Sequence, residues 1–277
     1  MAIALEGRLQ PLEIDALSQR FRGSQPFPFV QIDGFLCPDF AREVARTFPD
    51  MEAARAVGRS FRAVNEWGKT QVTDASAFPP PIRALQEALA DPHWLATLSR
   101  ITGIPDLLAD EELVGGGMHL MRSGALLDVH VDFNLIEDRR LFRRLNILVF
   151  LNEGWRPEWG GGLELWDAGV KTRHHCVLPE LNRCVIFETS EKSFHGVQKL
   201  SCPPGVIRRS FAAYYYTREA PPGWSGRRHT TIFRARPEER FKANVLMPAS
   251  RLRRALLRPV RRVARLFARA ETGSRPR

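Results

Sequence analysis

Two histidines and one aspartate are the residues of this sequence best suited to chemistry. His130 and Asp132 form an H-x-D triplet, and His195 follows further along the chain. In a β-strand, side chains two residues apart point to the same face, so the triplet would deliver an imidazole and a carboxylate to one metal ion. Two imidazoles and one carboxylate on one face of an octahedral ion, with open positions left, are typical of non-haem Fe(II) oxygenases. The spacing therefore predicts oxygen-activating chemistry at these three residues.

A possible anion anchor follows the second histidine. Arg208 and Ser210 share a strand face by the same period of two. A guanidinium grips a carboxylate through two parallel hydrogen bonds, and a hydroxyl beside it suits the same ligand. We expect this pair to bind the carboxylate of a 2-oxo acid that chelates the iron. Arg209 is the rival anchor because it is adjacent and equally charged, but only Arg208 shares a face with Ser210.

Taken singly, each of these residues has an ordinary explanation. An H-x-D pair is more often a surface contact, a lone histidine a structural residue, and one arginine of a basic chain a solvated side chain. The residues occur together, in this order and inside strand-like segments, and the combination favours the metal site. For His119 both a structural and a functional role are open: it either packs in the core or lines the cosubstrate pocket.

The likeness of the chain to a known family extends well beyond these residues, from about Pro26 to about Pro237. The motifs that carry it are TGI (102–104), GGGMH (115–119), HVDFN (130–134), RRLN (143–146), LNEGW (151–155), WGGGLELW (159–166), FETS (187–190), SFHGV (193–197), RRS (208–210) and YYYT (214–217). With these motifs the sequence resembles the 2-oxoglutarate- and Fe(II)-dependent oxygenases of the prolyl 4-hydroxylase-like branch.

The resemblance implies a cofactor set and a role for each matching residue. It implies that His130, Asp132 and His195 bind Fe(II). Arg208 would hold the distal carboxylate of 2-oxoglutarate with the help of Ser210. Asn146 is expected to offer an amide to 2-oxoglutarate from an adjacent strand, although core hydrogen bonding explains it equally well. Molecular oxygen would be the second cosubstrate, and ascorbate is a candidate reductant.

The reaction implied by the family is hydroxylation of an unactivated C–H bond, with oxidative decarboxylation of 2-oxoglutarate to succinate and CO2. The branch suggests a prolyl residue of a protein as substrate, while a small molecule, a sugar or a lipid-linked intermediate stays open. Two other classes of protein are the alternatives. One is a degenerate member that binds without turnover, against which the intact ligand set argues. The other is a non-catalytic, membrane-associated adaptor that acts through its C-terminal tail.

The order of the expected elements predicts a mainly β fold with supporting helices. Strand-like runs follow one another from about residue 113 to residue 217, after helical patterns, and this order indicates a jelly-roll barrel, the double-stranded β-helix, with helices packed on one face. We expect one dioxygenase domain over residues 1–250. It would comprise helical support over about 1–112, a core over 113–217 and a loop region over 218–250, and a basic amphipathic tail would follow over 251–277.

The N-terminal half contains several more specific signals. Residues 27–36 are strand-like, and a helix is expected to open at Pro38 with apolar residues every four positions. Another helix is expected from Ile82, and Asp91 followed by proline is typical of a helix N-cap. Residues 55–81 are polar and show no strong period, which predicts a surface loop, or else a mobile lid over the site.

Composition places the chain among globular proteins. Its 277 residues are 44% hydrophobic and 26% charged. No run approaches the roughly 18 apolar residues that would span a bilayer, and the first ten residues do not have the pattern of a signal peptide. The four cysteines form no C-x-x-C pair and fit reduced thiols. A cytoplasmic location is therefore expected, with peripheral attachment to a membrane as an option.

The positive charge is concentrated at the C-terminal end. Residues 251–277 contain ten arginines and one acidic residue, a net of +9, so the +10 of the whole chain leaves +1 for all preceding residues. Apolar residues recur at helical spacing beneath the arginines, although Pro259 should kink such a helix. Basic amphipathic segments bind anionic membranes or acidic partners. We expect one of these partners, or else a solvated end, and a nucleic acid is the least favoured.

Overall fold

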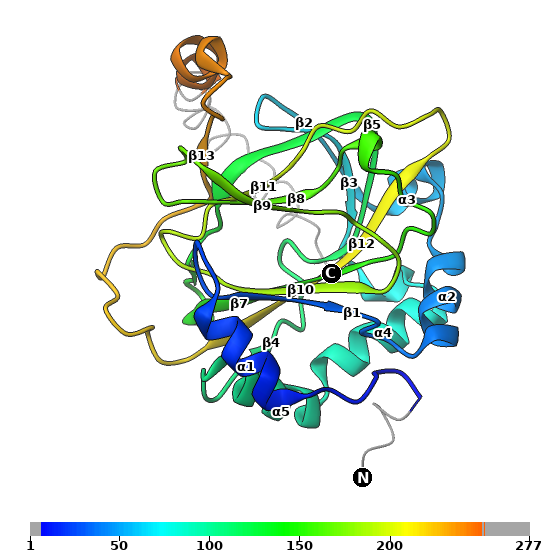
Figure 1. Cartoon of the computed structure of the whole chain (residues 1–277). Coiled ribbons are helices and arrows are strands. Elements are labelled where there is room, and N and C mark those ends of the chain that lie inside the picture. Colours follow the sequence, from blue (N-terminus) through cyan, green and yellow to red (C-terminus); the bar gives the residue numbers. More distant parts are fainter. Residues whose placement is uncertain (1–6, 251, 253–277) are drawn as a thin grey trace, which may run out of the picture. The chain divides into compact units, whose positions relative to one another are not determined.

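The computed structural model of the chain describes residues 7–250 and 252 and divides into two compact units, Met1–Arg234 and Ala235–Arg277. The first unit contains the helices and the sheet that Figure 1 shows. Its α-helices are α1 (Ile14–Gly23), α2 (Pro38–Thr47), α3 (Met51–Val57), α4 (Pro80–Ala90) and α5 (Pro92–Thr102). Its strands are β1 (Phe29–Asp33), β2 (Arg59–Ala63), β3 (Glu66–Val72), β4 (Leu108–Ala109), β5 (Gly117–Val131), β6 (Leu135–Ile136), β7 (Leu141–Phe150), β8 (Leu163–Trp166), β9 (Arg173–Val177), β10 (Arg183–Glu188), β11 (His195–Val197), β12 (Ile207–Thr217) and β13 (Ile232–Arg234).

One curled antiparallel sheet joins these strands, in the order β1-β10-β7-β12-β5-β11-β8-β9 along its main path. The long strand β5 connects the two layers of the barrel. Its first part pairs with β12, its last part pairs with β11 and β13, and β3 pairs with residues of both parts. Gly124 lies between these parts with φ +80°, a conformation that glycine adopts without strain. The expected double-stranded β-helix is confirmed.

Alternation along the strands separates a helix-covered face from the interior of the barrel. On β7, Ile147 and Val149 belong to the core cluster that contains buried residues of α1, α2, α4 and α5. Leu148 and Phe150 belong to a different cluster, inside the barrel. Figure 1 shows these four helices gathered beside β1, β7 and β10. The expectation of N-terminal helices on one face is confirmed, and so is the Asp91 cap, whose Oδ1 accepts a hydrogen bond of 2.8 Å from the backbone of His93.

The prediction of a loop over residues 55–81 is wrong. This segment contains the end of α3, the hairpin of β2 and β3, and the start of α4, and β3 pairs with β5 inside the main sheet. Lys69, Thr70 and Gln71 are polar and yet buried. Their polarity hid the strand, because sequence patterns identify a buried strand by its apolar residues.

Residues 218–250, expected to be a loop region, contain regular structure in both units. In the first unit, β13 pairs with β5, and the ring of Phe233 lies 5.3 Å from that of His130. In the second unit, a π-helical turn spans Lys242–Leu246, and helix continues through residue 250. The tail lies outside the described residues except for Leu252. Among the described residues, no helix is both long and apolar enough to cross a membrane.

Candidate metal and cosubstrate site

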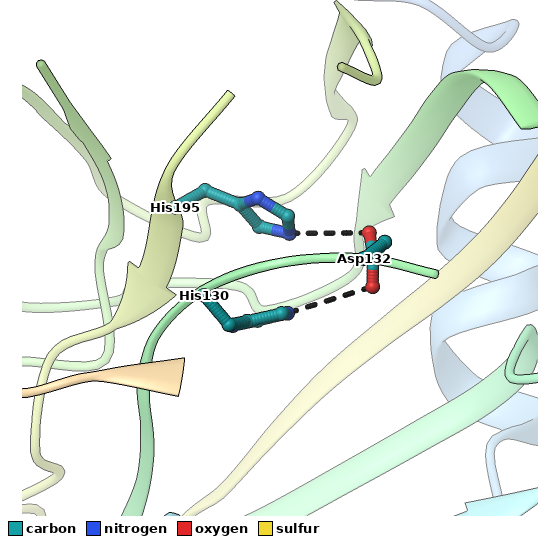
Figure 2. A group of neighbouring side chains, drawn as sticks. All are labelled: His130, Asp132 and His195. Atoms are coloured by element: carbon teal, nitrogen blue, oxygen red, sulfur yellow. Dashed lines mark ion pairs between the residues drawn. The ribbon is translucent and has the colours of Figure 1, made fainter. Parts of the chain in front are cut away.

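His130, Asp132 and His195 come together in the structure (Figure 2). His130 lies near the end of β5, Asp132 directly follows that strand, and His195 opens β11 as the pairing partner of His130. The Nε2 atoms of His130 and His195 lie 3.6 and 3.5 Å from the two carboxylate oxygens of Asp132. One ligand atom from each residue lies within 4.8 Å of the others. The three residues form a cluster that can hold one metal ion.

The protonation of the two imidazoles fits a metal site. His130 Nδ1 lies 2.8 Å from the carbonyl of Asp128, and His195 Nδ1 lies 3.0 Å from that of Ser193. A carbonyl only accepts hydrogen bonds, so each Nδ1 carries the proton and each Nε2 presents a lone pair towards Asp132. Burial lowers the pKa of His195 to about 3, so this ring stays neutral. Neutral imidazoles are the form that binds a metal.

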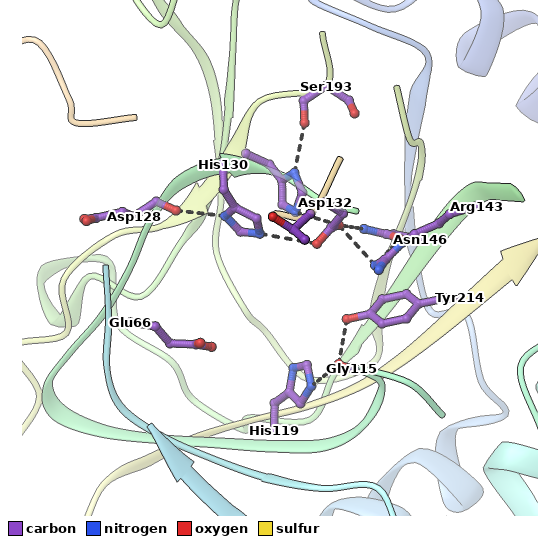
Figure 3. A network of polar contacts seen from close by, with 12 residues as sticks. Glu66, Gly115, His119, Asp128, His130, Asp132, Arg143, Asn146, Ser193 and Tyr214 are labelled. Carbon is purple, nitrogen blue, oxygen red and sulfur yellow. Dashed lines mark hydrogen bonds and ion pairs between the residues drawn. The ribbon is translucent and has the colours of Figure 1, made fainter. Parts of the chain in front are cut away.

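Two buried side chains hold the carboxylate of Asp132 (Figure 3). Its Oδ2 lies 3.1 Å from Arg143 Nη2 and accepts a hydrogen bond of 2.8 Å from Asn146 Nδ2. Arg143 also donates twice to Asn146 Oδ1, at 2.8 and 2.9 Å. Burial raises the pKa of Asp132, but the charge of Arg143 opposes this effect, and the pKa lies well below its usual range. Asp132 is therefore an oriented anion whose Oδ1 is free of these two donors.

The structure gives Asn146 and Arg143 roles that sequence patterns did not predict. Asn146 was expected to offer its amide to 2-oxoglutarate, but it uses both ends of the amide on Asp132 and Arg143. Arg143 lies three residues before Asn146, on the opposite face in a regular strand. The pairing of β7 with β12 shifts register between Tyr215 and Tyr216, and this bulge brings the two side chains to the same face.

Replacing Arg143 should weaken the metal site. We expect Arg143→Met to reduce the affinity for Co(II), a spectroscopic substitute for Fe(II), by about 10- to 100-fold, as for other residues that orient metal ligands. Without Arg143 the pKa of Asp132 rises, so protons compete with the metal at higher pH and the acid limb of the binding curve moves upward. Arg144→Met is the matched control, because Arg144 donates to Thr217 instead. Equal effects of the two replacements would contradict this role.

Arg208 is a buried cation on the interior face of β12. Its Nε donates to the carbonyl of Gly161 at 2.7 Å, and its Nη1 lies 3.4 Å from Ser210 Oγ. Burial lowers the pKa of Arg208 to about 10, yet the group stays charged near neutral pH. No carboxylate of the described residues lies within ion-pair distance of it. A buried guanidinium with a hydroxyl beside it fits the carboxylate of 2-oxoglutarate. Arg209 is less buried and belongs to the opposite face of the strand.

A comparison with protein families matches the part of the chain that contains this site. The 2OG-Fe(II) oxygenase superfamily matches residues 116–216, which include all three candidate ligands and Arg208. No curated protein is a significant sequence match.

Two solved structures show the same fold at low sequence identity. One is a prolyl hydroxylase from Trichoplax adhaerens, in complex with a peptide fragment of the hypoxia inducible factor oxygen degradation domain. It is 17% identical with a TM-score of 0.52, over 74% of this chain and 90% of that chain. The other is SnoN, an alpha ketoglutarate dependent epimerase from nogalamycin biosynthesis, 14% identical with a TM-score of 0.50, over 82% of this chain and 98% of that chain. Residues 116–216 therefore match the 2OG-Fe(II) oxygenase superfamily, and the chain shares its fold with a prolyl hydroxylase.

Proposed function

We propose that this enzyme is a dioxygenase that hydroxylates an unactivated C–H bond. One observation carries the proposal: the His130, Asp132 and His195 cluster and the buried cation Arg208 lie in one barrel. Iron(II) and 2-oxoglutarate are the cofactors of the superfamily, and together with oxygen they supply an oxidant while 2-oxoglutarate becomes succinate and CO2. In this proposal the three ligands bind the iron, and Arg208 with Ser210 binds the distal carboxylate. Ascorbate as reductant stays a prediction.

The protein's own residues orient the reactants and exclude water. Arg143 and Asn146 fix the carboxylate of Asp132, so that the metal meets a ligand that needs no reorganisation. The backbone carbonyls of Asp128 and Ser193 fix the two imidazole rings. Phe150 lies under the guanidinium of Arg208, whose Cζ is 5.1 Å from the ring centroid, and limits access of water to it. Two classes of substrate stay open: a prolyl residue of a protein, and a small molecule, sugar or lipid-linked intermediate.

The reaction is tested by measuring succinate and substrate mass together. We expect the purified chain, supplied with Fe(II) and oxygen, to convert 2-oxoglutarate to succinate, and a substrate in a mixed pool to gain one oxygen atom by mass spectrometry. Omission of iron or of oxygen is the control for each. Absence of succinate under all conditions would contradict the proposed function.

We further propose that residues 251–277 attach the enzyme to an anionic membrane surface, with an acidic protein as the alternative partner. The net charge of +9 in this segment supports the proposal. The exposed apolar side chains Phe241, Val245 and Leu252, at 67%, 46% and 63% exposure, precede or begin the segment and would add shallow insertion. A basic residue near an anionic leaflet contributes on the order of 1 kcal/mol.

Deletion of the tail should remove membrane binding and leave catalysis intact. We expect the full chain to co-sediment with anionic liposomes and not with neutral ones, and high salt to weaken this binding because it screens the charges. A chain that ends at Ser250 should stay in the supernatant and form succinate at the same rate. Equal sedimentation of both chains on anionic vesicles would leave the tail without this role. A full chain that binds anionic liposomes through the tail and forms no succinate would favour the non-catalytic adaptor.

A further inference from the structure

A buried ion pair lies beside the residues proposed to bind 2-oxoglutarate. Lys69 Nζ lies 2.6 Å from Glu66 Oε1, and the side chains are only 9% and 16% exposed. Burying such a pair adds little net stability, because the loss of hydration of two charges offsets their attraction. A stabilising role therefore does not account for the pair, and its position suggests binding.

A β-bulge in β3 places the side chains of Glu66 and Lys69 on the same face of the strand. Glu66 and Lys69 are three residues apart on β3, and in a regular strand their side chains would point to opposite faces. Relative to β2, strand β3 has one extra residue between Trp67 and Thr70, because Trp67 pairs with Arg62 and Thr70 pairs with Ser60. Gly68 in this bulge has φ +74°. The extra residue turns both charged side chains to one face. A Cβ at Gly68 would lie 2.9 Å from the Cβ of Ala125, so both the conformation and the space require glycine.

The face to which the bulge turns these side chains is the face of the proposed cosubstrate anchor. Lys69 pairs with Met121, and Met121 pairs with Arg208, so the three residues form one row across β3, β5 and β12. His119 lies in the next row beside Ser210. Paired residues and residues two apart share a face of a sheet. Lys69 and His119 therefore continue the interior face that carries Arg208 and Ser210.

His119 adds a hydrogen-bond acceptor to this face. Its Nε2 lies 3.0 Å from the carbonyl of Gly115, which only accepts, so Nε2 carries the proton and Nδ1 keeps a lone pair. Burial and the charges of Lys69 and Arg208 hold the pKa of His119 well below its usual range, so the ring is neutral. Figure 3 shows Glu66, His119 and Tyr214 around the space onto which His130 and Asp132 face.

We infer that this wall, formed by Glu66, Lys69 and His119, binds a substrate rich in hydroxyl groups, such as a sugar or cyclitol ring. The inference rests on the proposed function and chooses between its substrate classes. A hydroxyl both donates and accepts hydrogen bonds, so neighbouring hydroxyls can donate to Glu66 while accepting from Lys69, and another can donate to His119 Nδ1. A prolyl residue has no N–H, and its ring offers only C–H groups to such a wall.

The inference is tested with defined probes on the full chain. The hydroxylated probes are myo-inositol, methyl glucoside and methyl glucosaminide, and a proline-rich peptide represents the other class. Calorimetry on the chain with Fe(II) and 2-oxoglutarate, without oxygen, measures binding, and succinate formation in oxygen measures turnover. We expect at least one ring to bind and to raise succinate formation above the rate without substrate, and the peptide to do neither.

The outcomes separate the two proposals. If succinate forms but only the peptide binds, or no probe binds, the substrate class is wrong and the proposed function stands. If no succinate forms from 2-oxoglutarate with any probe or without one, the proposed function itself fails. These comparisons use the unaltered chain and do not depend on the folding of a variant.

A variant assigns the binding to the wall. We expect Glu66→Gln to raise the Kd of the bound ring about tenfold, because a charge-assisted hydrogen bond becomes a neutral one. Glu180→Gln is the matched control: it removes an ion pair of 3.1 Å with Arg183 elsewhere on the barrel and should leave the Kd unchanged. Unchanged affinity in Glu66→Gln, with the fold intact by circular dichroism, would overturn the inference.

Discussion

Asp132→Ala is expected to abolish both iron binding and turnover. The carboxylate contributes a bond and a negative charge to the metal site, and the two histidines alone leave the iron without its third protein ligand. The same replacement leaves Arg143 buried beside Asn146 without its anion. Removing one partner of a buried ion pair costs about 3–5 kcal/mol, so we also expect a lower free energy of unfolding. Thermal unfolding, Co(II) titration and succinate formation measure the three effects.

A second replacement separates the loss of the ligand from the loss of stability. Asp132→Asn keeps the shape of the side chain and can still accept a hydrogen bond from Arg143, so it should fold more stably than Asp132→Ala and yet remain inactive. Asp33→Ala is a control, since this carboxylate is 61% exposed and pairs with Arg183 away from the site. Conversion of 2-oxoglutarate to succinate by Asp132→Ala at the parent rate would show that the metal assignment is wrong.

Arg208→Ala is expected to raise the apparent KM for 2-oxoglutarate by roughly two orders of magnitude or more, because the distal carboxylate loses a charge-assisted, buried partner. Removing a buried cation without a protein counter-ion should not lower stability through a broken ion pair, so the effect should appear in KM. Steady-state succinate formation at varied 2-oxoglutarate measures it.

Arg209→Ala provides the matched control for this anchor. Arg209 has the same charge, lies next to Arg208 and points to the opposite face of β12. Its replacement should change the KM for 2-oxoglutarate far less. The reverse ranking of the two variants would move the anchor to Arg209, and would mean that the wrong face of β12 had been assigned to the cosubstrate.

The sequence was informative where residues follow a regular strand period. His130, Asp132, Arg208 and Ser210 could be placed on common faces because each pair is separated by two residues. Helix signals such as the proline after Asp91 were local and were equally readable. For these residues the spacing alone predicts which side chains share a face, because no bulge lies between the two members of each pair.

The remaining interactions depend on departures from that period. Arg143 meets Asn146, and Glu66 meets Lys69, each across three residues and each through a register shift between paired strands. Such register shifts depend on the partner strand and cannot be predicted from one sequence. Gly68 was the only residue that could indicate a bulge, and glycine also occurs at many positions without one. The wall segment was also polar, so burial could not be read from hydrophobicity.

The bulge at Gly68 also bears on how enzymes of this architecture can diverge. Replacing Gly68 with a residue that does not adopt φ +74° would favour regular alternation over these four residues. It would turn Glu66 and Lys69 to opposite faces, while β12, β5 and β11 would keep their places. A change of one codon could thus exchange the groups offered to a substrate without touching the oxidising centre. We therefore expect relatives that act on a different class of substrate to differ at the position of Gly68.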